Sequence, residues 1–143
     1  PNATFPARVN KKAAWTGVAR TVRGGDDLSD EFIVNFHDLW SGRPEMAVAY
    51  AFTYLISPED MDVSIALGSD DGVVVWLNGK EVHRHMIGRP YAPKQDRFFA
   101  HLKKGANPVL VKINQGGGEW MFSMHIESPD GRALPSVKAR LAP

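Results

Sequence analysis

The dipeptide Asn78-Gly79 is the feature that most constrains how this chain can fold. It stands between two short runs of strand-forming residues, Val73–Leu77 and Lys80–His83. Both central positions of a type I′ turn need a positive φ, and Asn followed by Gly meets that need at low cost. The sequence therefore predicts a two-residue β-hairpin. The expected cross-strand pairs are Leu77 with Lys80, Trp76 with Glu81, and Val75 with Val82.

Strand-like segments continue along most of the chain. Between Met46 and Ile56, bulky residues alternate with small ones, which is typical of a strand with one face in the core. No window of about 11 residues keeps a helical period. We expect further strands at Trp15–Val22, Glu31–Leu39, Val63–Leu67, Arg97–Leu102, Val109–Asn114 and Trp120–Glu127. The predicted fold is an all-β, antiparallel sandwich of about nine strands, in the range of a jelly roll.

The size of the chain fits one domain, residues 1–143, with linker-like edges at 1–12 and 129–143. Cysteine is absent, which excludes disulfides and thiolate metal sites but leaves export open. No run approaches the roughly 20 apolar residues of a membrane span, so we expect no membrane partner. The start, Pro1-Asn2-Ala3-Thr4, has neither an initiator Met nor a signal peptide. We therefore expect a domain excised from a larger secreted or periplasmic protein.

Connections between antiparallel strands alternate between the two ends of a sandwich. One end should then collect the segments 40–45, 69–72, 86–96 and 115–119, and the other end only short turns. The first set holds the one long loop, a triple glycine and paired aspartates. Loops at one end of a rigid scaffold commonly carry function. We expect the functional site there.

Catalysis and nucleic-acid binding both fit the sequence poorly. A glycosidase needs two carboxylates at a fixed separation in a cleft, and no acid here has such surroundings. His83 and His85 share one face of a strand and can ligate zinc, but no third ligand is evident, and a solvated strand face is the alternative. The basic stretch 80–104 is balanced by the acidic stretch 26–71 and lacks a nucleic-acid reading motif.

Two stretches carry a resemblance to sugar-binding β-sandwiches. The segment Val63–Val82 resembles the galactose-binding-like jelly-roll domain that precedes the catalytic barrel of family 2 glycoside hydrolases, and Leu102–Ile113 is similar to the loop, Gly, Asn and apolar strand that close such sheets. The turn 69–72 and the loop 114–118 resemble the lectin domain first described in anthrax protective antigen. In that domain, paired aspartates and a later Asn hold calcium beside the sugar. The resemblance implies a carbohydrate-binding module.

The expected ligand contacts lie in the clustered loops. Aromatic rings stack on the apolar faces of sugars, and Arg suits bidentate hydrogen bonds to anionic groups. The candidate platforms are Trp40, Tyr91 and Trp120, and the candidate polar contacts are Arg43, Arg89, Lys94 and Gln95. Trp120 is also a core candidate, because it shares its strand parity with Phe122. The basic contacts predict an acidic polysaccharide or oligosaccharide whose binding weakens as salt rises.

A calcium ion (Ca²⁺) is the expected cofactor, held by Asp70, Asp71 and Asn114 with backbone carbonyls of the glycine loop, Gly116–Gly118. Adjacent carboxylates repel one another, and a hard divalent cation with oxygen ligands relieves that repulsion. A plain Asp-Asp-Gly turn is the alternative. The sequence thus favours a non-catalytic carbohydrate-binding module that targets an attached secreted enzyme to a polysaccharide. The alternative is a structural spacer that packs against a catalytic domain without a ligand of its own.

Overall fold

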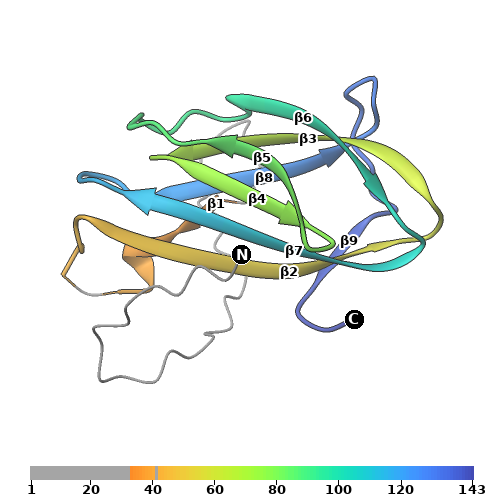
Figure 1. Ribbon diagram of the computed structural model, residues 1–143, viewed down its shortest axis with the longest axis horizontal. Coiled ribbons are helices and arrows are strands. Elements are labelled where there is room, and N and C mark those ends of the chain that lie inside the picture. Colours follow the sequence, from red (N-terminus) through yellow and green to blue (C-terminus); the bar gives the residue numbers. More distant parts are fainter. Residues whose placement is uncertain (1–32, 41) are drawn as a thin grey trace.

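Two antiparallel sheets packed as a β-sandwich make up the computed structural model, which describes residues 33–40 and 42–143 (Figure 1). The four-stranded sheet has the order β1-β8-β3-β6, and the five-stranded sheet has the order β5-β4-β7-β2-β9. The strands are β1 (Ile33–Asn35), β2 (Ala47–Ser57), β3 (Met61–Asp70), β4 (Val73–Leu77), β5 (Lys80–His85), β6 (Asp96–Leu102), β7 (Gly105–Gln115), β8 (Met121–Glu127) and β9 (Lys138–Arg140). The predicted all-β sandwich of about nine strands is confirmed.

The core forms where the inner faces of the two sheets meet. Along β7, every second residue from Asn107 to Gln115 is buried, which is the pattern of a strand with one face in the core. Along β3, by contrast, every residue from Val63 to Asp70 is buried. The long loop 86–95 covers the outer face of β3 near its end, since the loop backbone at Ala92 lies directly against Gly68. Part of the outer face of β3 is thus covered by the loop that was expected to carry the site.

The predicted hairpin is present, with a positive φ at both Asn78 and Gly79. The pairs Leu77–Lys80 and Trp76–Glu81 are confirmed. The pair Val75–Val82 is wrong, because a β-bulge shifts the register and sets His83 opposite Val75. As a result, neighbouring residues of β5 turn inward together. Val82 packs against the core, while His83 reaches Asp96 on β6.

The chain differs from expectation near its edges. Of the predicted strand 31–39, the structure describes residues 33–39; among these only Ile33–Asn35 form a strand, and a short 3-10 helix, η1 (Phe36–Asp38), follows it. The Asn35 side chain caps this helix by accepting a hydrogen bond from the amide of His37 at 3.0 Å. The predicted strand Trp15–Val22 lies outside the described residues. In the tail, β9 pairs with Tyr54–Ile56 of β2. In the part of the chain that the structure describes, no helix is long and apolar enough to cross a membrane.

Candidate functional site

Four loop segments meet at one end of the sandwich, on the left of Figure 1, as the alternation of loops predicts. Asp71 is their centre. Its Oδ1 accepts the backbone amide of Arg89 at 3.0 Å, and its Oδ2 accepts the backbone amide of Gly116 at 2.7 Å. The amide of Met46 donates to the carbonyl of Gly116 at 3.3 Å. One carboxylate therefore joins the β3–β4 turn, the long loop and the glycine loop.

Two of the predicted aromatic platforms form one stack at this end. The rings of Trp40 and Trp120 are 5.5 Å apart with an interplanar angle of 25°, and Phe36 stacks on Trp40 at 5.8 Å. Trp120 is only 2% exposed, which corrects its role from platform to core residue. Trp40 is 45% exposed. The buried indole of Trp120 thus supports the solvent-exposed indole of Trp40.

Charged side chains lie on the two loops that carry Trp40 and Trp120. The guanidinium Nη1 of Arg43 lies 3.8 Å from Oε1 of Glu119, and both side chains are largely exposed. The carboxylate of Glu45 lies beside Gly117 of the glycine loop. These loops offer two carboxylates and one guanidinium at the same end of the sandwich as the exposed ring. Of the predicted contacts, Trp40, Arg43, Lys94 and Gln95 are exposed, and Trp40 and Arg43 lie on the loop before β2.

Arg89 is not an open ligand contact, which corrects the sequence-based prediction. Its side chain is only 9% exposed and donates to both oxygens of Asp96, at 2.8 and 2.7 Å, and to Oγ of Ser69 at 2.7 Å. Burial acts to raise the pKa of Asp96, but hydrogen bonds from Arg89, His85 and His83 outweigh it and hold that pKa far below its usual range. Arg89 therefore neutralises a buried carboxylate.

Lys94 and Gln95 are likewise engaged within the domain. Nζ of Lys94 lies 2.9 Å from Oε1 of Glu127, which Arg97 also binds. Gln95 accepts the backbone amide of Ser69 at 3.0 Å and donates from its Nε2 to a loop carbonyl at 2.7 Å. Both residues hold the long loop against the four-stranded sheet. Both residues are exposed, and their role as ligand contacts stays a prediction.

Tyr91 lies over the four-stranded sheet rather than beside Trp40. Its hydroxyl donates to Oγ of Ser123 on β8 at 3.0 Å, and its amide donates to Oδ2 of Asp70 at 3.3 Å. The ring is half-buried against Gly68. Tyr91 therefore packs the long loop onto β3 and β8 and does not join the stack of tryptophans.

The three predicted calcium ligands lie close together. The amide of Asp71 donates to the carbonyl of Asn114 at 3.1 Å, and the amide of Asn114 donates to the carbonyl of Gly72 at 2.8 Å. Burial and the neighbouring Asp71 raise the pKa of Asp70. Oδ1 of Asn114 is buried and accepts no hydrogen bond from the described residues. Both oxygens of Asp71 accept backbone amides, and Asn114 offers an amide oxygen without a partner among the described residues. Carboxylate and amide oxygens are the donors that a hard cation prefers.

A second metal-binding arrangement lies where β5 ends and β6 begins, on either side of the long loop. His83, His85 and Asp96 place one ligand atom each within 4.8 Å of one another. Sequence reasoning considered the two histidines but missed Asp96. The only available signal was that Asp96 begins the strand after the long loop, and that signal does not show that β6 lies beside β5.

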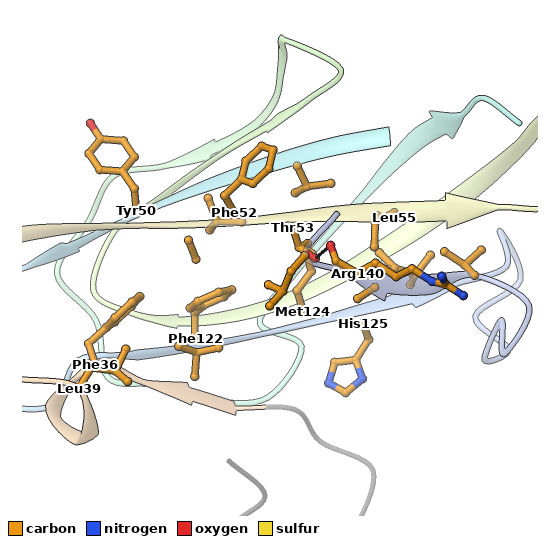
Figure 2. Close-up of a pocket in the computed structure, with 18 of the residues that line it drawn as sticks. Phe36, Leu39, Tyr50, Phe52, Thr53, Leu55, Phe122, Met124, His125 and Arg140 are labelled. Atoms are coloured by element: carbon orange, nitrogen blue, oxygen red, sulfur yellow. Dashed lines mark hydrogen bonds between the residues drawn. The ribbon is translucent and has the colours of Figure 1, made fainter. Parts of the chain in front are cut away.

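An apolar groove of about 590 Å³ opens between the two sheets on the β2 and β8 side. Figure 2 shows Phe36 of η1 and Phe122 of β8 pointing toward β2. Most of the lining is hydrocarbon, and Thr53, His125 and Arg140 are among its few polar residues. The sequence did not predict this groove. A sugar needs a hydrogen-bonding partner for most of its hydroxyls, so the loop end is the better candidate site.

Comparisons with known proteins add little to this geometry. No family model matches the chain, and no curated protein matches it. Among solved structures, the chain is similar to the PA14 domain of the antifreeze protein MpAFP, with 14% sequence identity and a TM-score of 0.49. The match covers 65% of this chain and 52% of that chain, so the chain spans about half the length of that structure. The candidate function therefore rests on the residues described above.

Proposed function

We propose that this domain is a non-catalytic carbohydrate-binding module whose ligand stacks on Trp40. One observation carries the proposal: an exposed indole stacks on the buried indole of Trp120, on loops that also carry two carboxylates and a guanidinium. A rigid aromatic ring binds the apolar face of a sugar at low entropic cost. Nearby charged groups can then bind its hydroxyls through charge-assisted hydrogen bonds.

The charges around Trp40 favour a neutral glycan. The expectation of an acidic ligand depended on Arg89 and Lys94, and both are paired with carboxylates of the domain itself. On the loops that carry Trp40 and Trp120, two of these charged groups are acidic, Glu45 and Glu119, and one is basic, Arg43. Carboxylates accept hydrogen bonds from hydroxyls but repel anions. We therefore propose a neutral polysaccharide or oligosaccharide as the ligand.

Calcium at Asp70, Asp71 and Asn114 belongs to the same proposal. The residues fit the ion, because Asp70 has a raised pKa beside Asp71 and because Oδ1 of Asn114 has no partner among the described residues. A bound cation would favour the ionised form of both carboxylates. If calcium binds only the folded domain, adding it after chelation must raise the melting temperature. Identical melts in calcium and in excess chelator would contradict this part of the proposal.

The wider setting that we propose is a secreted or periplasmic enzyme that carries this domain as an accessory. A second candidate function, a spacer that packs against a catalytic domain, is favoured by a separate observation. The outward side of β2 exposes an apolar row that includes Val48 and Tyr50, the latter 45% exposed. Exposed apolar patches mark interaction surfaces when they are contiguous.

The two functions separate in one binding experiment. Wild-type protein, Trp40→Ala and Tyr50→Ala would be run in affinity electrophoresis against neutral, uronic-acid and sulfated polysaccharides at two salt concentrations. Trp40 and Tyr50 are equally exposed, so each variant is a control for the other. We expect retention on a neutral polysaccharide, at least a tenfold loss in Trp40→Ala, and no loss in Tyr50→Ala. No retention on any polysaccharide favours the spacer, and salt-sensitive binding to acidic polymers alone contradicts a neutral ligand.

A further inference from the structure

Three side chains that ligate transition metals converge where the edges of the two sheets meet. His83 and His85 are alternate residues of β5, the edge of the five-stranded sheet, and Asp96 begins β6, the edge of the four-stranded sheet. Nε2 of His83 lies 2.9 Å from Oδ2 of Asp96, and Nδ1 of His85 lies 2.9 Å from Oδ1 of the same residue. A single carboxylate thus meets two imidazoles from the other sheet.

The surroundings hold these ligands in place and leave a route from solvent. The ring of His83 stacks on Phe98 with centroids 4.5 Å apart and an interplanar angle of 1°. Asp96 is buried, whereas 38% of the His85 side chain is exposed. Fixed ligands favour metal binding because less freedom is lost when the ion binds. Two imidazoles and one carboxylate suit zinc and its neighbours in the first transition row, and not calcium.

The guanidinium of Arg89 lies between His85 and Asp96. Its Nη1 lies 2.9 Å from Nδ1 of His85 and 2.8 Å from Oδ1 of Asp96. Nδ1 of His85 can accept a hydrogen bond from Arg89 or donate one to Asp96, but it cannot do both. If Nδ1 accepts from Arg89, its lone pair faces the acceptor Oδ1 of Asp96. If Nδ1 donates to Asp96, its N–H faces the N–H groups of the Arg89 guanidinium. One of the three contacts is therefore repulsive in either protonation state.

A divalent cation removes this conflict. It would take its electron pairs from Nδ1 of His85, Nε2 of His83 and a carboxylate oxygen of Asp96, and it would replace the positive charge that Arg89 now supplies. The buried Nε of Arg89 makes no hydrogen bond within the described residues, so that moving the side chain breaks no hydrogen bond at this atom. Its backbone amide would stay on Asp71, so that only the side chain need move.

We propose that His83, His85 and Asp96 form a binding site for a divalent transition-metal ion of the zinc class, which the ion enters in exchange for the Arg89 guanidinium. Metal occupancy is then coupled to the long loop 86–95, because Arg89 is one of the residues that hold this loop on Ser69 and Asp96. The site shares no ligand with the proposed sugar site or the proposed calcium site, and Arg89 connects it to Asp71 through the long loop.

Titration with zinc chloride by isothermal calorimetry, after treatment with chelator, tests the proposal, and cobalt(II) absorption reports the ligand set. We expect one zinc ion per chain and at least a tenfold weaker affinity in His83→Ala and in His85→Ala. The matched control is His101→Ala, which removes an exposed histidine that pairs with Asp62 elsewhere on the surface. Arg89→Gln is expected to bind zinc more tightly, because the competing charge is gone.

Thermal melts establish whether each variant is folded. If His83→Ala does not fold, His85→Ala still tests the site, because it removes the most exposed ligand. Absence of zinc binding in both the wild type and Arg89→Gln would overturn the site. Binding that survives in His85→Ala but is lost in His101→Ala would also overturn it. Unchanged affinity in Arg89→Gln would overturn the exchange with Arg89.

Discussion

The carboxylate of Asp71 accepts the backbone amide of Gly116 at 2.7 Å, so that one side chain fastens the β3–β4 turn to the glycine loop. Its second oxygen accepts the amide of Arg89 in the long loop. A hydrogen bond to a charged group contributes about 1.5–3 kcal/mol to stability. We predict that Asp71→Ala, measured in excess chelator, lowers the free energy of unfolding by about 2–4 kcal/mol.

Urea denaturation monitored by tryptophan fluorescence checks this prediction. Asp62→Ala is the matched control, because Asp62 is 77% exposed and its ion pair with His101 lies on the surface. Surface pairs contribute little, so this control should change stability by less than about 0.5 kcal/mol. Equal effects of the two substitutions would show that Asp71 does not hold the loops together.

At the end of the sandwich opposite the clustered loops, Asn107 is predicted to be the polar residue whose substitution lowers stability most. It is fully buried, and its Nδ2 donates to the carbonyls of Lys103, Gly105 and Leu55, at 2.7, 3.1 and 3.2 Å. Its Oδ1 accepts the amide of Lys103 at 2.9 Å. Asn107→Leu would leave these buried groups unpaired, and each costs about 1–3 kcal/mol.

We therefore expect Asn107→Leu to lower the free energy of unfolding by about 3 kcal/mol or more, measured by urea denaturation. Lys103→Ala is the control, since it keeps the backbone groups that Asn107 binds and removes only an exposed side chain. A loss of less than about 1 kcal/mol in Asn107→Leu would contradict the proposed anchoring role.

The sequence predicts the parts of this fold that depend on neighbouring residues. The Asn78-Gly79 turn and the alternation along β2 are local signals, and the strands lie where those signals place them. The gathering of the loops at one end follows from antiparallel connection alone. The bulge at Val82 was missed because it depends on how β5 packs against the other sheet.

The roles of the site residues depend on partners far along the chain. Arg89 and Lys94 carry the right charge for a ligand, but Asp96 and Glu127 neutralise them, and nothing in the sequence shows that these acids lie on adjoining strands. Trp120 could be assigned to the core by its strand parity. The stack of Trp40 on Trp120 could not be predicted from the sequence, since it needs the short helix η1 that turns the chain after β1.

Acid is predicted to destabilise the domain through Asp96. Burial acts to raise its pKa, but hydrogen bonds from Arg89, His85 and His83 lower it further, and the net shift is downward. A carboxyl with a lowered folded-state pKa contributes stability that is present above its unfolded pKa of about 3.9 and is lost as the pH falls through the folded value. Asp96→Asn leaves the guanidinium of Arg89 buried without its partner.

We expect Asp96→Asn to be less stable than the wild type by about 3–5 kcal/mol at pH 7, with the difference narrowing as the pH falls below about 4. Urea denaturation at a series of pH values measures both quantities. His101→Ala should follow the wild-type curve, since its ion pair is exposed. A difference that stays constant from pH 7 to the acid limit would contradict the assignment to Asp96.

Gly68 is predicted to be indispensable for seating the long loop. A Cβ at this position would lie 2.1 Å from the carbonyl oxygen of Ala92 and 3.0 Å from Cε2 of Tyr91. The first of these atoms belongs to the backbone and cannot turn aside, so the loop must lift from β3 if Gly68 becomes Ala. Lifting would separate Tyr91 from Ser123 and expose the loop. Overpacking of this kind costs about 1–3 kcal/mol.

Limited trypsin digestion at the Lys94–Gln95 bond reports this opening directly. We expect cleavage of Gly68→Ala to be at least tenfold faster than that of the wild type, because local opening exposes the bond before global unfolding does. Gly117→Ala is the matched control, since the nearest atoms to its added Cβ belong to the flexible side chain of Glu45 at 3.8 Å. Equal cleavage rates in all three proteins would show that the position of the loop does not require a glycine at residue 68.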